Sequence, residues 1–238
     1  MKLPTSLHSA LLAAALAVLA APADAAPFAA AAVVPPRSTG PGSAWPRPSL
    51  RCTGAEAPTL ILDSGGESLG LWSRVQAQLA AGSRVCVWNA GAPEPAATDA
   101  VALHAALRAA GESGPYLRVA HGRGGDRAVA FAMRYPDEVL GLALVDVPAL
   151  AAGPALPDEL LLAVVSSAVP ADALAGGRLD IAWQHRQAAL AALSAQSFHF
   201  VGDSQRGLLP ERDPETVATA LDWLRRQVQL AATVRDAD

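Results

Sequence analysis

The segment that most constrains the fold is a short apolar run followed by a glycine cluster. The run Tyr116-Leu-Arg-Val-Ala120 leads into Gly122-Arg-Gly-Gly125, and a helical pattern then continues to Tyr135. Pro136 would end that helix, because proline has no N–H and its ring clashes with the preceding turn. The order predicts a strand, a tight turn and a helix, with Gly122 at the apex of the turn.

The rest of the chain from residue 51 alternates apolar runs with helical patterns. The strands expected are residues 58–63, 84–88, 116–120, 139–145, 160–165 and 198–201, and the helices expected lie near 71–79, 98–109, 124–135, 179–193 and 213–228. Thr98-Asp99 is expected to cap the second of these helices. Strands that are apolar throughout and alternate with helices indicate an α/β fold, a mostly parallel sheet with helices on both faces.

In such a sheet, ligands bind at the carboxyl ends of the strands. The residues expected at those ends are Asp63-Ser64, Trp88-Asn89, Ala120–Arg123, Asp146, Ser166-Ser167 and Gly202–Ser204. We therefore expect any small-molecule partner to bind among them.

The N-terminal region predicts export. Lys2 precedes the apolar run Leu11–Ala20, and Ala23-Asp-Ala25 follows with small residues where a signal peptidase cleaves. The run is shorter than the roughly 20 residues that a membrane-spanning helix needs. We expect residues 1–25 to be a signal peptide, 26–50 an Ala/Pro-rich flexible linker, and 51–235 one domain of a periplasmic or secreted protein with no membrane span after cleavage.

The cysteine content and the net charge limit which partners and bound groups we expect. An exported chain with one pair of cysteines, Cys52 and Cys86, predicts a disulfide, the alternative being two buried thiols. The net charge of −4 and the absence of a basic cluster argue against nucleic acid as a partner. The histidines are scattered, so we expect no metal site and no cofactor.

The chain resembles the α/β-hydrolase superfamily, most closely its exported bacterial branch. The resemblance covers about residues 51–230, and the segments that carry it are Cys52–Gly54 with Pro58–Gly66, Trp72–Trp88, Gly111–Val139, Leu142–Asp146 and Pro214–Val217. It implies hydrolysis of carboxylic esters by a Ser, His and acid triad.

The catalytic positions depart from the family pattern. The family elbow reads G-H-S-x-G-G, whereas this chain has Ala120-His-Gly-Arg-Gly-Gly125, so Gly122 offers no nucleophilic atom. The turn that would hold the histidine, residues 203–207, has none. His199 precedes it within the expected strand and should face a sheet surface. Asp172 is the candidate acid, and Asp146 is the alternative.

Other parts of the site can still be matched. The backbone of Gly65, Gly66 and Arg123 could form an oxyanion-like set of donors. The side chains expected near the pocket are Ser64, His121, Arg123 and Asp146. The connector after Asp146 is too short for the family's cap, and His104 and His185 are expected at surface or packing positions.

Three functional hypotheses follow. The first is a pseudoenzyme that binds a small molecule or a protein through the old site. The second is an active serine-type ester or lactone hydrolase with a rearranged site, which would recruit Ser64, Ser166, Ser167 or Ser204. The third is a relic with no selected function. The sequence assigns no oligomeric state.

Overall fold

A computed structural model describes residues 48–66, 69–151, 156–157, 159–169 and 179–235. The chain divides into residues 1–42 and 43–238, and the fold described below is that of the second unit. The expected signal peptide, most of the expected linker and the candidate acid Asp172 lie outside the described residues.

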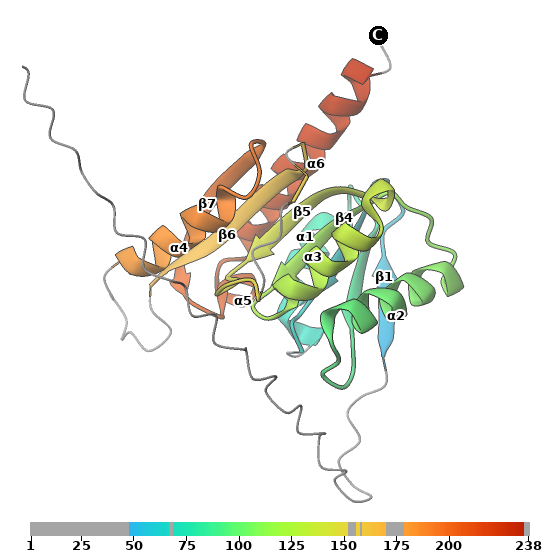
Figure 1. Ribbon diagram of the computed structural model, residues 1–238, viewed down its shortest axis with the longest axis horizontal. Helices are drawn as coiled ribbons and strands as arrows, with labels where there is room; N and C mark the ends of the chain where they lie inside the picture. The colour runs from blue at the N-terminus through green and yellow to red at the C-terminus, as the bar shows by residue number, and fades with distance from the viewer. Residues whose placement is uncertain (1–47, 67–68, 152–155, 158, 170–178, 236–238) are drawn as a thin grey trace, which may run out of the picture. The chain divides into compact units, whose positions relative to one another are not determined.

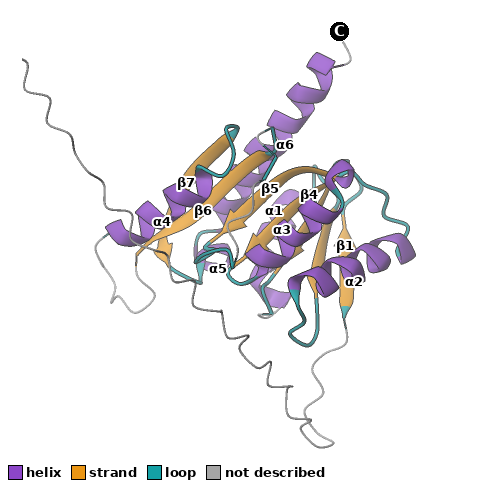
Figure 2. Ribbon diagram, viewed as in Figure 1, coloured by secondary structure: helices purple, strands orange, loops and turns teal. Residues whose placement is uncertain are grey.

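A seven-stranded sheet forms the centre of the domain, in the order β1-β3-β2-β4-β5-β6-β7 (Figures 1 and 2). The strands are β1 Ser49–Thr53, β2 Thr59–Asp63, β3 Val85–Asn89, β4 Tyr116–His121, β5 Val139–Val145, β6 Leu161–Val169 and β7 Ser197–Gln205. β1 pairs antiparallel with β3, and every other neighbouring pair is parallel. The mostly parallel sheet predicted from the sequence is confirmed.

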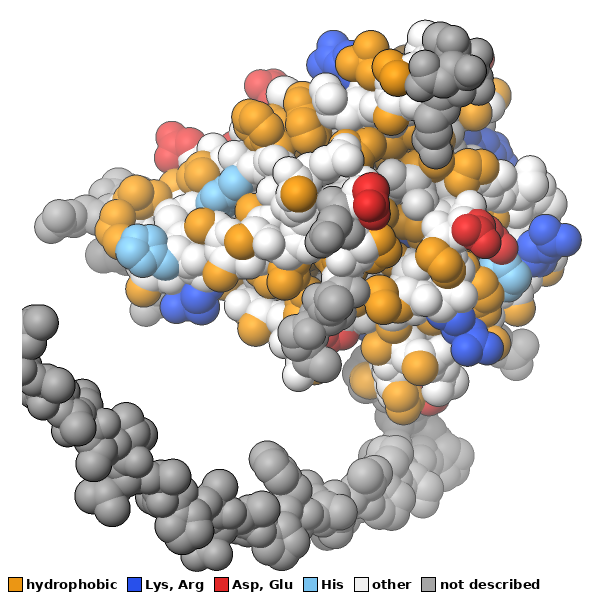
Figure 3. Space-filling view, turned by 45° about the horizontal axis from the view of Figure 1, so that its top comes forward, with side chains coloured by type: hydrophobic (Ala, Val, Ile, Leu, Met, Phe, Trp, Pro, Cys, Tyr) orange, Lys and Arg blue, Asp and Glu red, His pale blue; other side chains and the backbone are white. Residues whose placement is uncertain are grey.

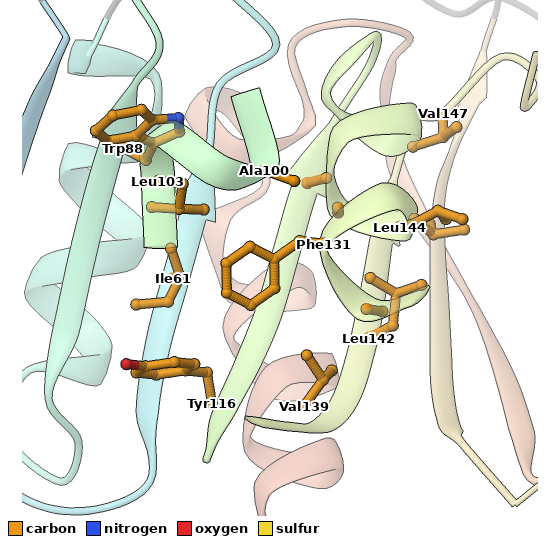
Figure 4. Packing of buried hydrophobic residues seen from close by; sticks show 14 of the residues in the cluster. Ile61, Trp88, Ala100, Leu103, Tyr116, Phe131, Val139, Leu142, Leu144 and Val147 are labelled. Carbon is orange, nitrogen blue, oxygen red and sulfur yellow. The ribbon is translucent and has the colours of Figure 1, made fainter. Parts of the chain in front are cut away.

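Helices cover both faces of the sheet. They are α1 Ser73–Leu79, α2 Ala96–Ala109, α3 Gly124–Arg134, α4 Ile181–Ala191, α5 Leu209–Arg212 and α6 Pro214–Arg235, with 3-10 turns at Leu69–Trp72 and Pro136–Glu138. One apolar core packs α2, α3 and α4 on the sheet, and a second packs α1, α5 and α6 on the other face. Figure 4 shows the first core, where Phe131 of α3 lies between the sheet residues Ile61 and Leu142.

β1 is the strand that the sequence analysis missed. It begins at Ser49, inside the segment expected as linker, and its partly exposed side chains give no apolar run. Cys52 of β1 lies directly opposite Cys86 of β3, and the two form a disulfide. The predicted disulfide is therefore confirmed, and it fastens the first strand to the sheet.

Several boundaries differ from those expected. β6 continues to Val169, so Ser166 and Ser167 lie within the strand and not at its end. β7 continues to Gln205, which places much of the expected 203–207 turn in the strand. α2 begins at Ala96, and Asp99, expected to cap it, is buried within its first turn. α4 is shorter than the range 179–193.

None of the helices in the described part of the chain has the length and apolar character that crossing a bilayer requires.

Candidate functional site

The turn between β4 and α3 has the geometry of a nucleophile elbow. Gly122 has a φ of +53°, its N–H donates to the Val145 carbonyl at 3.0 Å, and its own carbonyl accepts from Gly125 N–H at 3.3 Å. A Cβ added at Gly122 would meet no heavy atom within 4 Å. The backbone turn and the open space in front of it are therefore present, at a residue with no side chain to react.

The loop after β2 packs directly against this elbow. Gly65 has a φ of +71°, and a Cβ there would lie 2.6 Å from the His121 carbonyl oxygen and 3.0 Å from Gly124 N. Only glycine fits such a close approach. Gly65 N–H donates to Asp63 Oδ1 at 2.9 Å, which leaves Gly66 and Arg123 as the candidate backbone donors for a ligand.

A buried ion pair holds the loop and the elbow helix together. Asp63, at the end of β2, is 1% exposed, and its carboxylate accepts two hydrogen bonds from the Arg127 guanidinium of α3, one of them from Nε at 3.0 Å. Arg118 of β4 is fully buried, with Nη2 3.8 Å from Asp63 and its guanidinium 5.2 Å from the Phe131 ring centroid. Burial lowers the pKa of Arg118 to about 10, although Asp63 and Asp99 oppose that shift.

Asp99 completes this buried group of four charges. Its Oδ1 accepts from Trp88 Nε1 at 3.2 Å, and its Oδ2 lies 3.3 Å from Arg127 Nε. Burial, followed by the nearby Asp63 carboxylate, raises the pKa of Asp99. The sequence analysis did not identify this group. The available signal was Arg118 in the middle of an otherwise apolar strand, because a buried charge needs a partner.

A cavity of about 560 Å³ opens beside the elbow. Its walls come from the loops after β2, β3 and β5 and from the first turns of α3, and they comprise Gly65, Gly66, Ala90, Gly91, Ala92, Pro93, Glu94, Ala96, Arg123, Asp126, Arg127, Val129, Ala130 and Ala151. These wall residues include no hydroxyl, thiol, imidazole or amine side chain. Of the four predicted pocket side chains, Arg123 lines the cavity, whereas Ser64, His121 and Asp146 are buried outside its walls. The predicted backbone donors Gly65 and Gly66 also line it.

The turn after β7 holds an arginine. The Arg206 guanidinium pairs with the Asp180 carboxylate and lies 3.9 Å from the centroid of the Trp183 ring. Asp180 also caps α4 by accepting from Trp183 N–H at 2.9 Å. That backbone hydrogen bond and, more weakly, Arg206 lower the pKa of Asp180. Arginine stays protonated at any ordinary pH, so Arg206 cannot act as a general base.

Asp146, directly after β5, links that strand end to β6 and to the turn after β7. Its Oδ1 accepts from Ser167 N–H at 2.7 Å and from Ser167 Oγ at 2.9 Å, and its Oδ2 accepts from Gly207 N–H at 2.9 Å. It also has a φ of +48°, which is uncommon for a residue with a Cβ. These contacts give Asp146, the alternative candidate for the catalytic acid, a structural role.

Ser166 and His199 form a pair on the α4 face of the sheet. Ser166 Oγ lies 2.8 Å from His199 Nε2 and 3.0 Å from Gln184 Oε1, while Gln184 Nε2 donates to the Ser167 carbonyl at 2.8 Å. A carbonyl only accepts, so the Gln184 amide nitrogen must face Ser167 and its oxygen must face Ser166. The Ser166 hydroxyl then donates to Gln184, and His199 Nε2–H donates to Ser166.

That direction is the reverse of a catalytic pair, in which the serine donates its proton to the histidine. Ser166 is also fully buried, and burial lowers the pKa of His199. Ser64, Ser167 and Ser204 are buried as well. The serines considered for a rearranged site are therefore enclosed by protein.

The remaining histidines in the described ranges either pack against aromatic rings or lie on the surface. The His121 ring meets Trp72 edge to face at a centroid distance of 6.4 Å. His104 stacks on Tyr135 and contacts Glu138 at 3.0 Å. His185 is exposed on α4.

On the face shown in Figure 3, acidic and basic side chains are interspersed among apolar and uncharged surface.

Comparison with known proteins gives the fold. No family model matches the chain. An uncharacterized protein of Schizosaccharomyces pombe is 38% identical in an alignment of 86 residues, and the match covers 32% of this chain. This chain spans 16% of that relative's length.

Solved structures of hydrolases match over most of the domain. An esterase from Thermogutta terrifontis has a TM-score of 0.63 at 18% identity, over 76% of this chain and 93% of that one. The enol-lactonase from Burkholderia xenovorans has a TM-score of 0.59 at 14% identity, over 74% and 95%. A hydrolase from Pseudomonas aeruginosa has a TM-score of 0.59 at 16% identity, over 74% and 93%. The chain has the α/β-hydrolase fold.

Proposed function

We propose that the protein is a non-catalytic member of the α/β-hydrolase superfamily that binds a small molecule in the cavity beside the elbow. The observation that carries the proposal is Gly122, which stands at the apex of an intact elbow with open space before it. A nucleophile is needed there for acyl transfer. The walls of the adjacent cavity supply no hydroxyl or thiol side chain that could take its place.

The position of the base supports the same reading. Where the family has a histidine, Arg206 forms an ion pair with Asp180 and stacks on Trp183. Restoring a base would require breaking this ion pair as well as exchanging a residue. Loss of the nucleophile and loss of the base are thus two separate changes, which argues against a site that a single neighbour completes.

The cavity has the properties of a binding site. Its volume lies within the range typical of small-molecule pockets, roughly 300–1,000 Å³. The Ala, Pro and Val side chains of its walls can contact the apolar part of a ligand. N–H groups in the first turn of α3 can donate to a carbonyl oxygen of that ligand. Arg127 is neutralised by Asp63 and Asp99, and the other charged wall residues, Arg123, Glu94 and Asp126, carry both signs. The walls therefore do not favour an anion, and we favour a neutral ligand such as an ester, lactone or amide.

The same proposal places the protein outside the cytosol, in the periplasm or beyond the cell. The supporting observations are the N-terminal signal-like sequence and the disulfide between Cys52 and Cys86, since disulfides persist mainly in oxidising compartments.

A thermal-shift screen tests the binding proposal. We expect at least one neutral lactone, ester or amide to raise the unfolding temperature, because a ligand at 100 times its Kd stabilises the folded state by about 2.7 kcal/mol. Ala130→Trp and Ala92→Trp, which fill the cavity from two different walls, should each abolish the shift. Met133→Trp, on the same helix as Ala130 but exposed outside the cavity, should retain it.

Two results would contradict the proposal. If no compound in the panel stabilises the protein, the result would favour the hypothesis that the protein is a relic with no selected function. A ligand whose shift survives both cavity-filling substitutions would place binding elsewhere.

A further inference from the structure

A carboxylate lies beside the two sulfur atoms of the disulfide. Cys52 of β1, Cys86 of β3 and Glu112, in the turn between α2 and β4, have their sulfur and carboxylate oxygen atoms within 4.8 Å of one another. Cys86 is fully buried, Glu112 is 8% exposed, and Cys52 is partly exposed. Two sulfur atoms and one carboxylate therefore converge from three separate elements.

Arg84, directly before β3, orients this carboxylate. Its Nε donates to Glu112 Oε1 at 3.0 Å, and its Nη2 donates to the same oxygen. Its Nη1 donates to the Gly54 carbonyl, just after β1, at 2.8 Å. The two hydrogen bonds to Glu112 end on Oε1 and do not occupy Oε2. Carboxylates that bind metals in proteins are commonly held in this way by a hydrogen-bonding neighbour.

Reduction would turn the two sulfur atoms into metal ligands. A thiol reductant exchanges with the Cys52–Cys86 bond, so that the protein gains two thiols and the reductant becomes a disulfide. Cys52 is partly exposed on the edge strand β1, which gives a small thiol a path to the bond. The antiparallel pairing of β1 with β3 places the Cα atoms of Cys52 and Cys86 3.9 Å apart, so the thiols would remain neighbours.

The distances and charges suit a zinc ion. A tetrahedral Zn²⁺ binds thiolate sulfur at about 2.3 Å and carboxylate oxygen at about 2.0–2.2 Å, which puts its ligand atoms roughly 3.5–3.8 Å from one another. The three ligand atoms already lie within 4.8 Å, so small side-chain rotations bring them into position. Binding releases the two thiol protons.

Arg84 also balances the charge of such a site. The charges of two thiolates, the Glu112 carboxylate, a divalent ion and the Arg84 guanidinium add to zero. A buried group of charges is costly unless it is compensated in this way. Water can supply the fourth ligand, because Cys52 is partly exposed.

We propose that the reduced protein binds one Zn²⁺ ion through Cys52, Cys86 and Glu112, and that the ion replaces the disulfide in fastening β1 to β3. The disulfide and the metal exclude each other, because both use the same sulfur atoms. The sequence analysis expected no metal site, since it considered the spacing of histidines and did not place Glu112 beside the cysteines. The inference does not depend on what the cavity binds.

Titration of the purified protein with Zn²⁺ and Co²⁺ tests the proposal. The protein is reduced with a dithiol and freed of it without oxygen. We expect the reduced wild type to bind one ion, with a thiolate-to-cobalt charge-transfer band and tetrahedral d–d bands for Co²⁺. The oxidised wild type and reduced Cys52→Ser, which has a single thiol, should show neither band.

Three carboxylate and arginine variants separate a built site from zinc held by two thiols alone. Glu112→Gln removes a ligand and should raise the Kd for Zn²⁺ at least about 100-fold, whereas Arg84→Gln removes only its neighbour and should raise it about tenfold. Glu138→Gln takes a carboxylate from another ion pair, with His104, and should leave the Kd unchanged. Circular dichroism checks that each variant folds.

Hydrogen exchange measures whether the metal fastens the strand. Amides of residues 49–53 should exchange slowly in the oxidised protein, faster after reduction, and slowly again once Zn²⁺ is added. Glu112→Gln should show no such recovery. A reduced wild type that binds no Zn²⁺, an affinity unchanged in Glu112→Gln, or exchange of β1 that Zn²⁺ does not slow would each overturn the proposal.

Discussion

Gly122 combines a retained backbone conformation with a missing side chain. Its φ of +53° is the left-handed conformation that a nucleophile elbow imposes on its apex residue, and the position in front of it is open. Glycine adopts that conformation without strain, whereas a serine would incur a cost in stability. The residue is therefore compatible with a site kept for its shape and no longer used for acyl transfer.

Gly122→Ser separates the missing nucleophile from the missing base. We expect the variant to fold, with a loss of about 1–2 kcal/mol for a side chain in the left-handed region. It should still not turn over esters, because no histidine stands at the turn after β7. Calorimetry and p-nitrophenyl acetate hydrolysis measure the two effects.

Gly65→Ser is the matched control for space. Its Cβ would lie 2.6 Å from the His121 carbonyl oxygen, so it should destabilise the protein more than Gly122→Ser does. Equal losses in the two variants would contradict the geometry described for the elbow.

His199 gives a pH-dependent prediction at the residue scale. Burial lowers its pKa, so the folded state binds fewer protons than the unfolded state. The stability that neutral His199 contributes is present above the unfolded pKa of 6.5, and it is lost as pH falls below that value. His199→Gln should remove this acid-side loss. Urea unfolding of both proteins between neutral and mildly acidic pH measures it.

The same histidine has an assigned tautomer, with the proton on Nε2 directed at Ser166. Nitrogen-15 spectra of the imidazole distinguish the two tautomers. A proton on Nδ1, with Nε2 accepting from Ser166, would reverse the direction of these hydrogen bonds. That result would support a catalytic role for Ser166 and His199.

At the scale of elements, the disulfide fastens the short first strand to β3. It closes a loop with a sequence separation of 34 residues, for which the chain-entropy model gives about 3–4 kcal/mol. We expect the double substitution Cys52→Ala and Cys86→Ala to lower the free energy of unfolding by that amount in urea titrations. The wild type measured with reductant should lose a similar amount, and no loss in either experiment would contradict the prediction.

The elements that the sequence predicted well are those whose apolar runs are buried on both faces. Leu60, Ile61 and Leu62 of β2 are fully buried, and their run was clear. β1 was missed because its stability comes from pairing with β3 and from Cys52, not from an apolar run. The range predicted for β7 was too short for a similar reason. The second half of this strand alternates exposed and buried residues at the sheet edge and contains no apolar run.

The site was predictable where it depends on local backbone and not where it depends on distant partners. The glycine turn identified the elbow, and Gly65 and Arg123 do line the cavity. Asp99 was expected to cap a helix, yet its partners are Trp88 and Arg127, from separate elements. The pairing of Arg206 with Asp180 likewise joins residues 26 positions apart, and neither lies in a recognisable motif.

At the scale of the whole molecule, the domain combines the α/β-hydrolase fold with a cavity whose walls hold no hydroxyl, thiol or imidazole side chain. The buried pair of Asp63 and Arg127 keeps the loop after β2 against α3 and so holds one wall of the cavity in place. A scaffold of this kind can serve binding alone, because function resides in the site and not in the fold.

The central claim is that this site does not perform acyl transfer, and one measurement tests it most directly. The purified protein is incubated with short and long p-nitrophenyl esters and, in parallel, with a fluorophosphonate probe followed by intact-mass analysis. The account predicts hydrolysis no faster than a heat-inactivated control and no mass increase. Turnover above that control together with a covalent adduct mapped to a serine, such as Ser166, would contradict it.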